Sequence, residues 1–271
     1  MSDIRIDQRI ALHHRSLSPQ ERKAAETLIE HLEDLATYRA AELADLAGVS
    51  RATMSRLFRS LGFTGFDEVR DHLRTLRSAG EPRRLAGTPD LSQVASAEAD
   101  AISDVLGQPA LARAVSLIAE APSVLVAGWR NSYPVALHLR QQLAQARPAV
   151  RLVPVPGQTI GEEIADLGPD DAVVAVGFRR RPTVFGMLLE AVAETGASIV
   201  VIADPSASLH LTRADAALTC SVEGPLAYDS YAAAMCLVSV VADGVLHACG
   251  RGARERVSTI GAAYDRLREL E

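Results

Sequence analysis

Arginines and short hydroxyl side chains alternate through one segment of the N-terminal third of the chain. They are Arg51, Thr53, Ser55, Arg56 and Arg59, preceded by Ser50 as a candidate helix cap. A helix that enters the major groove of DNA needs such groups, which donate hydrogen bonds to base edges and pair with phosphates. We therefore predict that these six residues bind DNA. The alternative is a helical hairpin whose polar face meets only solvent.

A run of three arginines, Arg179 to Arg181, is the second pattern with evident chemistry. The run follows the apolar residues 172–176 and Gly177, and Pro182 ends it where a helix is expected to start. Guanidinium groups at a helix N-terminus bind carboxylates or phosphates, because bidentate pairing adds to the helix dipole. We predict a small anion here, held mainly by Arg179. The alternatives are a solvated turn, an internal ion pair and a contact between subunits.

The remaining part of this anion site is predicted from two other segments. After residues 124–127 the chain reads Gly-Trp-Arg-Asn-Ser, in which the glycine permits a tight exit and Ser132 is able to cap a helix or bind an anion. Near the C-terminus, Asp229 is either the N-cap of the last helix or a partner for one arginine. The predicted effector-binding residues are Gly128, Arg130, Asn131, Ser132, Gly177, Arg179, Arg180 and Ser230.

Helical periodicity surrounds the predicted DNA-binding residues. Two short helices are expected in 41–61, with Gly48 at the turn between them and Val49 inserted between the helices. The apolar faces are predicted to be Leu43, Leu46 and Ala47 on the first helix and Met54, Leu57, Phe58 and Leu61 on the second. Upstream, Ser18, Pro19 and Glu21 form a capping box before the stripe Ala25, Leu28, Ile29 and Leu32. Downstream, Phe66, Val69, Leu73 and Leu76 predict a further helix.

Beyond residue 94 short apolar runs alternate with helical stretches. This alternation predicts a doubly wound, five-stranded parallel sheet covered on both faces. The expected strands are 124–127, 150–155, 172–176, 199–203 and 216–220, and the expected helices are 134–146, 160–167, 183–194 and 228–247. Ligands of such sheets bind at the carboxyl ends of the strands, where both arginine-bearing loops lie.

Composition divides the chain and bounds its class. Residues 77–89 hold Gly, Pro and charge without periodicity, so we expect a linker at 77–94 between a helical domain at 1–76 and an α/β domain at 95–271. The net charge of -6 argues against a general nucleic-acid coat. No apolar run is expected to reach the length of a bilayer span, and the polar N-terminus indicates a cytoplasmic protein. The spacing of the three cysteines indicates reduced thiols, and neither a cofactor nor a metal is expected.

The chain resembles the RpiR/MurR family of bacterial transcription regulators over nearly everything from Leu17 to Cys249. The most specific part is 18–70, with its paired helices, its Gly-Val-Ser turn and the Gly-Phe-Thr-Gly-Phe continuation. The resemblance implies an N-terminal helix-turn-helix, a C-terminal sugar isomerase (SIS) domain, binding to double-stranded operator DNA, and homodimers or homotetramers.

The resemblance also implies a ligand, and the chain departs from the family at that point. Family members that bind phosphosugars place a serine where Ser132 stands, and a Ser-x-Ser-Gly-x-Thr run that falls here on 177–182, where both serines are replaced. The effector is therefore expected to be a carboxylate or another small anion at least as readily as a sugar phosphate. The alternative function is a sugar-phosphate isomerase or binding protein, for which Glu162, Glu163 and His210 are candidate proton carriers, although their spacing does not place them near the loops.

Overall fold

The computed structural model describes residues 6–14, 16–30, 35, 38–78 and 90–269. The chain divides into two compact units: the first comprises residues 1–89 together with 226–228, and the second comprises residues 90–225 and 229–271. Residues 79–89, which make up most of the predicted linker, lie outside the described residues. The last four residues of that predicted linker are helical, because α6 (Leu91–Leu106) begins at Leu91. The predicted domain limits remain a prediction.

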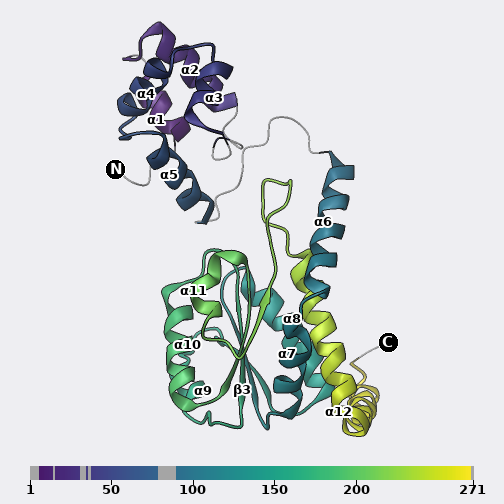
Figure 1. Cartoon of the computed structure of the whole chain (residues 1–271). Coiled ribbons are helices and arrows are strands. Elements are labelled where there is room, and N and C mark those ends of the chain that lie inside the picture. The colour runs from purple at the N-terminus through teal and green to yellow at the C-terminus, as the bar shows by residue number, and fades with distance from the viewer. Residues whose placement is uncertain (1–5, 15, 31–34, 36–37, 79–89, 270–271) are drawn as a thin grey trace. The chain divides into compact units, whose positions relative to one another are not determined.

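The described part of the first unit is helical, as predicted (Figure 1). Its helices are α1 (Ile6–His13), α2 (Pro19–Glu30), α3 (Ala40–Leu46), α4 (Arg51–Ser60) and α5 (Phe66–Ser78). One core joins them, and its buried residues include Ala25, Leu28, Leu43, Met54, Leu57, Phe58, Leu61 and Val69. The capping box of α2 is confirmed, because the Ser18 amide donates to Glu21 Oε2 at 2.9 Å and the Glu21 amide donates to Ser18 Oγ at 3.3 Å.

Two predicted core positions in this unit are wrong. Leu46 is 48% exposed and Ile29 is 45% exposed, whereas Ala44 and Ala24 are buried. The buried stripes of α2 and α3 are therefore rotated by part of a turn from the predicted ones. Leu32 and the side chain of Leu76 lie outside the described residues.

The second unit contains the predicted five-stranded sheet. Its strands are β1 (Val124–Gly128), β2 (Val150–Val153), β3 (Ala172–Gly177), β4 (Ser198–Ala203) and β5 (Ala216–Thr219). All pairs are parallel in the order β2-β1-β3-β4-β5, which confirms the predicted fold class. Because side chains alternate along each strand, successive residues enter different cores: Val124 and Val126 pack on one face, and Leu125 and Ala127 on the other.

Helices cover both faces of the sheet (Figure 1). On one face lie α7 (Ala110–Glu120), α8 (Ser132–Ala146) and α12 (Ala232–Leu267), and α6 packs against α12. On the other lie α9 (Gly161–Ile164), α10 (Thr183–Thr195) and α11 (Ser208–Leu211), the last preceded by the 3-10 turn η1 (Pro205–Ala207). The order of strands reverses between β1 and β3, so the loops after these two strands flank the point where such sheets bind ligands.

The helix α12 differs from the prediction in three ways. It begins at Ala232, four residues after the predicted start, so Asp229 is not its N-cap, and Tyr231 occupies that position. It continues past the predicted end to Leu267, across a kink at Gly250, whose φ is 56°. It also contains a window of 18 residues with mean hydropathy 1.8, so the expectation that no run is long and apolar enough to span a bilayer is wrong. That helix packs on α8 and α7 and contributes Leu237 and Val241 to the core.

Candidate functional site

The predicted DNA-binding hairpin is formed by α3 and α4. Gly48 occupies the turn with a φ of 59°, which a glycine adopts without strain. Its amide donates to Asp45 O, and the Val49 amide donates to Ala44 O, each at 3.0 Å. Ser50 caps α4 as predicted, because its Oγ accepts from the Thr53 amide at 3.1 Å. The turn and the cap together fix where α4 begins.

One residue predicted on the outer face of α4 lies inside. Thr53 is 5% exposed, and its hydroxyl is hydrogen bonded to Ser50 Oγ at 2.9 Å and accepts from Arg56 Nη2 at 3.3 Å. Its predicted exposure is therefore wrong: as the third residue of the helix it closes the cap instead of reaching outward. It positions Arg56.

The remaining predicted DNA-binding residues share the outer face of α4. Ser50, Arg51, Ser55, Arg56 and Arg59 are all exposed. The guanidinium of Arg59 donates from Nε to Ser55 O at 3.2 Å. Within the described residues, no carboxylate forms an ion pair with Arg51, Arg56 or Arg59. The face therefore presents three guanidinium groups.

In the second unit, the loops after β1 and β3 meet as predicted. Ser132 is 4% exposed, and its Oγ accepts from the Phe178 amide at 2.9 Å, which joins the start of α8 to the β3 loop. Both strand ends require glycine: a Cβ on Gly128 would lie 2.8 Å from the Ala136 Cβ, and one on Gly177 would lie 2.4 Å from the Phe185 ring. These glycines bring α8 and α10 close to the sheet, which places both helix N-termini beside the loops.

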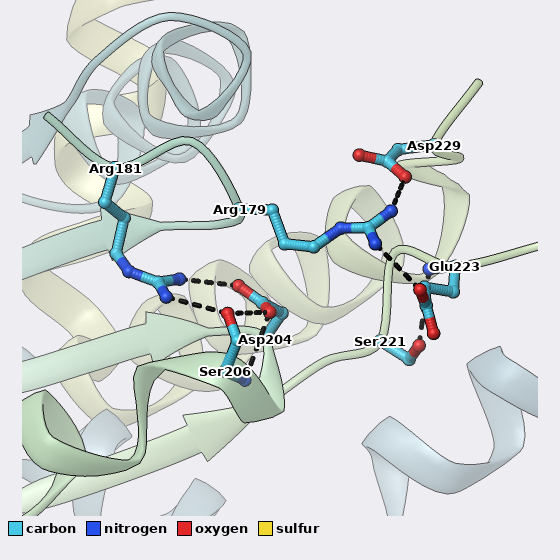
Figure 2. A network of polar contacts seen from close by, with 7 residues as sticks. All are labelled: Arg179, Arg181, Asp204, Ser206, Ser221, Glu223 and Asp229. Carbon is cyan, nitrogen blue, oxygen red and sulfur yellow. Dashed lines mark hydrogen bonds and ion pairs between the residues drawn. The ribbon is translucent and has the colours of Figure 1, made fainter. Parts of the chain in front are cut away.

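The three consecutive arginines of the β3 loop take three different paths. Arg179 forms ion pairs with Glu223 Oε1 at 2.7 Å and with Asp229 (Figure 2). Arg181 turns the other way and pairs with Asp204 Oδ1 at 2.6 Å, while its Nη1 also donates to Gly177 O at 2.9 Å. Arg180, between them, is exposed. Within the described residues it forms no ion pair.

Arg130, in the β1 loop, is like Arg180 in two respects. It is exposed and has no carboxylate partner within the described part of the chain. Both residues also adopt the left-handed backbone conformation, with φ of 55° at Arg130 and 64° at Arg180. Such a backbone costs a non-glycine residue about 1 to 2 kcal/mol and is concentrated at functional sites. The two loops thus each present, at the same edge of the sheet, one strained arginine that has no ion-pair partner among the described residues.

The segment between β5 and α12 closes this edge from a third side. Asp229 meets Arg179, and Tyr231 packs edge-on against Phe178, with ring centroids 5.4 Å apart. A side-chain hydrogen bond joins Tyr231 to Asn131, and burial raises the pKa of the Tyr231 hydroxyl. Ser230 supports the loop, because its amide donates to Val222 O at 2.9 Å.

Three residues at this edge were missed from the sequence. Asp204 follows a strand and precedes a proline, which is a turn signal that could have identified it as a cap. Glu223 and Tyr231 carry no signal in one sequence, because their roles depend on the return of the loop across the sheet. The prediction that Asp229 is able to pair with an arginine is confirmed.

Comparisons with known proteins agree with this architecture. The model of the helix-turn-helix domain of the rpiR family matches residues 4–79, and the SIS domain model matches residues 117–243. The chain is thus of the RpiR type. No curated protein matches this chain.

Among solved structures, the SIS domain resembles that of an RpiR transcription factor from Sphaerobacter thermophilus, with 24% identity, TM-score 0.56, and coverage of 65% of this RpiR-type chain and 98% of the other. The NanR protein of Vibrio vulnificus, solved with ManNAc-6P, is 20% identical with TM-score 0.59. The match covers 97% of this chain and 98% of NanR. A proposed sugar-phosphate isomerase from Listeria monocytogenes is 20% identical with TM-score 0.51. The match covers 64% of this chain and 98% of the isomerase. At these identities the likeness shows the fold.

Proposed function

We propose that this chain is a DNA-binding transcription regulator that senses a small anionic metabolite. The helix α4 enters the major groove of operator DNA, and the loops after β1 and β3 bind the metabolite. Binding of the metabolite changes operator affinity. The domain composition supports the regulatory class, and the exposed arginines support the two binding surfaces.

The observation that carries the ligand proposal is the pair Arg130 and Arg180. Structures rarely place a bulky residue in the left-handed region, and here two such residues present guanidinium groups from adjacent loops. The N-terminus of α8 adjoins the β3 loop, since Ser132 Oγ accepts from the Phe178 amide at 2.9 Å. A helix N-terminus and two guanidinium groups together favour a phosphate or carboxylate.

Arg179 has a different part in this proposal from the one predicted. The sequence predicted that it would be the principal ligand of the anion, but its guanidinium is held by two carboxylates. We therefore assign the primary ligand contacts to Arg130 and Arg180, with Arg179 at the margin of the site. The ligand class includes sugar phosphates, as in the neighbour NanR, which was solved with ManNAc-6P.

We further propose that the chain is not an enzyme. An aldose-ketose isomerase needs an acid and a base beside the substrate carbonyl. Glu163 is paired with Arg151 at 2.8 Å, Glu162 accepts from Thr159 Oγ1 at 2.5 Å, and His210 packs against Phe185. These three candidates are therefore engaged in local contacts. Formation of a ketose phosphate from an aldose phosphate would favour the isomerase alternative.

The active form is proposed to be a cytoplasmic homodimer or homotetramer. Positive and negative side chains balance in the first 80 residues, so each DNA-binding unit has few charges with which to hold phosphate groups. Two copies on a two-fold related operator would supply the affinity that one lacks.

The test compares the double variant Arg130→Ala/Arg180→Ala with Arg251→Ala, which removes an exposed arginine from α12. Isothermal calorimetry on the full chain measures binding of sugar phosphates, dicarboxylates and their neutral analogues. Each charge-assisted contact contributes roughly 1.5 to 3 kcal/mol, so the double variant is expected to lose at least about tenfold in affinity. Operator affinity without ligand is expected to stay unchanged in both variants. Equal anion affinity in the double variant, or tighter binding of a neutral analogue, would overturn the proposed site.

A further inference from the structure

We infer that Glu223 is a built-in occupant of the anion site, which competes with the ligand for the guanidinium of Arg179. The inference rests on the proposed function, because it concerns the same ligand. It adds a residue that sets ligand affinity and a loop whose attachment changes when the ligand binds. In Figure 2 Arg179 lies between the two carboxylates, with Glu223 on one nitrogen and Asp229 on the other.

The two carboxylates differ in burial, and this difference separates their roles. The side chain of Asp229 is 19% exposed, that of Arg179 is 10% exposed, and that of Glu223 is 48% exposed. Asp229 therefore holds Arg179 in a largely buried contact. Glu223 reaches the same guanidinium from the solvent side, at the position an incoming anion would approach.

Exchanging Glu223 for a ligand has a low energetic cost. Glu223 is 48% exposed, so water solvates its carboxylate after it leaves, and the incoming anion takes its place on the largely buried guanidinium of Arg179. A phosphate that also contacts Arg130 and Arg180 gains further charge-assisted hydrogen bonds, so it displaces a single carboxylate. Losing Asp229 would instead leave a largely buried charge without its partner. The exchange is thus expected at Glu223 alone.

The exchange would also change how the segment between β5 and α12 is held. Glu223 follows Val222, whose carbonyl accepts from the Ser230 amide at the base of the loop. Beyond it, Gly224 lies beside α6, since a Cβ there would be 3.8 Å from Glu98 Oε1. When the ligand displaces Glu223, the loop keeps its contact with Arg179 through Asp229 and loses the one through Glu223. The helix α6 begins at Leu91, within the predicted linker of 77–94, so this change occurs next to the segment that leads to the DNA-binding unit.

The experiment measures binding of inorganic phosphate to the full chain by calorimetry. Glu223→Gln removes the competing charge and keeps the side-chain size. Glu190→Gln is the matched control. Glu190 lies on α10, is 59% exposed and pairs with Arg213 at 2.7 Å. From the contribution of an exposed ion pair, Glu223→Gln is expected to bind phosphate about threefold to fivefold more tightly than the parent. Glu190→Gln is expected to match the parent.

A second measurement reports the loop directly. Hydrogen exchange of residues 221–227 is expected to rise when phosphate is added to the parent, and to be raised already in Glu223→Gln without phosphate. Unchanged or weaker phosphate binding by Glu223→Gln, including no binding by either protein, would overturn the inference. Arg130→Ala/Arg180→Ala separates the two proposals: if it loses phosphate while Glu223→Gln equals the parent, the anion site stands and the competition does not.

Discussion

The arginines of α4 and those of the β3 loop are equally prominent in the sequence, yet the fold treats them differently. On α4 the guanidinium groups of Arg51, Arg56 and Arg59 form no ion pair with a carboxylate of the described residues, and Arg56 and Arg59 donate to oxygens of their own helix. In the β3 loop, Arg179 and Arg181 are each paired with carboxylates of other loops, Arg181 with one after β4 and Arg179 with two between β5 and α12. A helix surface leaves its charges available to a partner, whereas a sheet edge brings distant carboxylates to them. Arginine content alone therefore does not identify a binding surface.

The largest expected effect comes from the arginines of α4. Arg51→Ala/Arg56→Ala is expected to weaken binding to DNA by at least about thirtyfold, because each lost contact to a base or phosphate costs about 1 to 3 kcal/mol. The slope of affinity against salt concentration is expected to fall by about two units, one for each lost phosphate contact. Fluorescence anisotropy measures both on DNA that the parent selects from a random pool.

Two controls accompany that double variant. Arg251→Ala removes a different exposed arginine, which pairs with Glu255 within α12, and should leave DNA affinity unchanged. Light scattering should show the same oligomer for all three proteins. If the double variant binds the selected DNA as tightly as the parent, α4 is not the recognition helix.

A smaller effect, on the stability of the second unit, distinguishes Arg179 from its neighbour Arg180. Arg179→Ala is expected to lower the stability of the second unit by about 1.5 to 3 kcal/mol, because it leaves the largely buried Asp229 without its charge-assisted hydrogen bond. At about 2 to 4 °C per kcal/mol this lowers the melting temperature by roughly 3 to 12 °C. Arg180→Ala removes no ion pair and should leave the melting temperature nearly unchanged.

The single tryptophan makes this measurement specific. Trp129 lies in the β1 loop and packs against Phe185, with ring centroids 6.3 Å apart, so its fluorescence reports unfolding of the second unit. Equal melting temperatures for the two variants would show that the contacts of Arg179 do not stabilise the loop, and would remove the contrast drawn between paired and unpaired arginines.

How much the sequence reveals depends on the range of the contacts. The cap at Ser50, the turn at Gly48 and the capping box of α2 join residues at most a few positions apart, and all three were predicted correctly. The five strands were also predicted, because a buried parallel strand is a continuous apolar run. Thr53 was misplaced because periodicity gives a direction but not the hydrogen bond that turns a hydroxyl inward.

The anion site shows where such reasoning ends. The sequence identified both loops correctly as neighbours at one sheet edge, because parallel topology fixes where strand ends meet. It could not show that Glu223 reaches Arg179, since 44 residues separate them. The sequence also could not show that Asp204 pairs with Arg181, because the two residues follow the ends of different strands, β4 and β3. Pairing at a sheet edge is a property of the folded chain.

The smallest expected effect concerns a carboxylate near the unpaired arginines. Hydrogen bonds from Ser18, first from its side chain and then from its backbone, lower the pKa of Glu21 below its usual 4.5, and the charge of Arg56 adds to the shift. A carboxyl whose pKa is lower in the folded state stabilises it above the unfolded pKa. This stabilisation is lost as the pH falls through the folded pKa. Glu21→Gln should therefore destabilise α2 at pH 7 and lose this effect as the pH falls through the folded pKa, below which the carboxyl is protonated in both states.

Hydrogen exchange of residues 19–30 in the full chain measures this effect. At pH 7 the variant is expected to lose about 0.5 to 1 kcal/mol of protection, which is the ordinary contribution of a helix cap. Glu26→Gln is the control, because Glu26 is exposed on the same helix and lies outside the capping box. A loss of protection that is the same at pH 7 and below the folded pKa would mean that the ionised carboxylate does not stabilise α2. Arg56 would then lie beside a carboxylate without any measurable attraction, and α4 would present its charges to DNA undiminished.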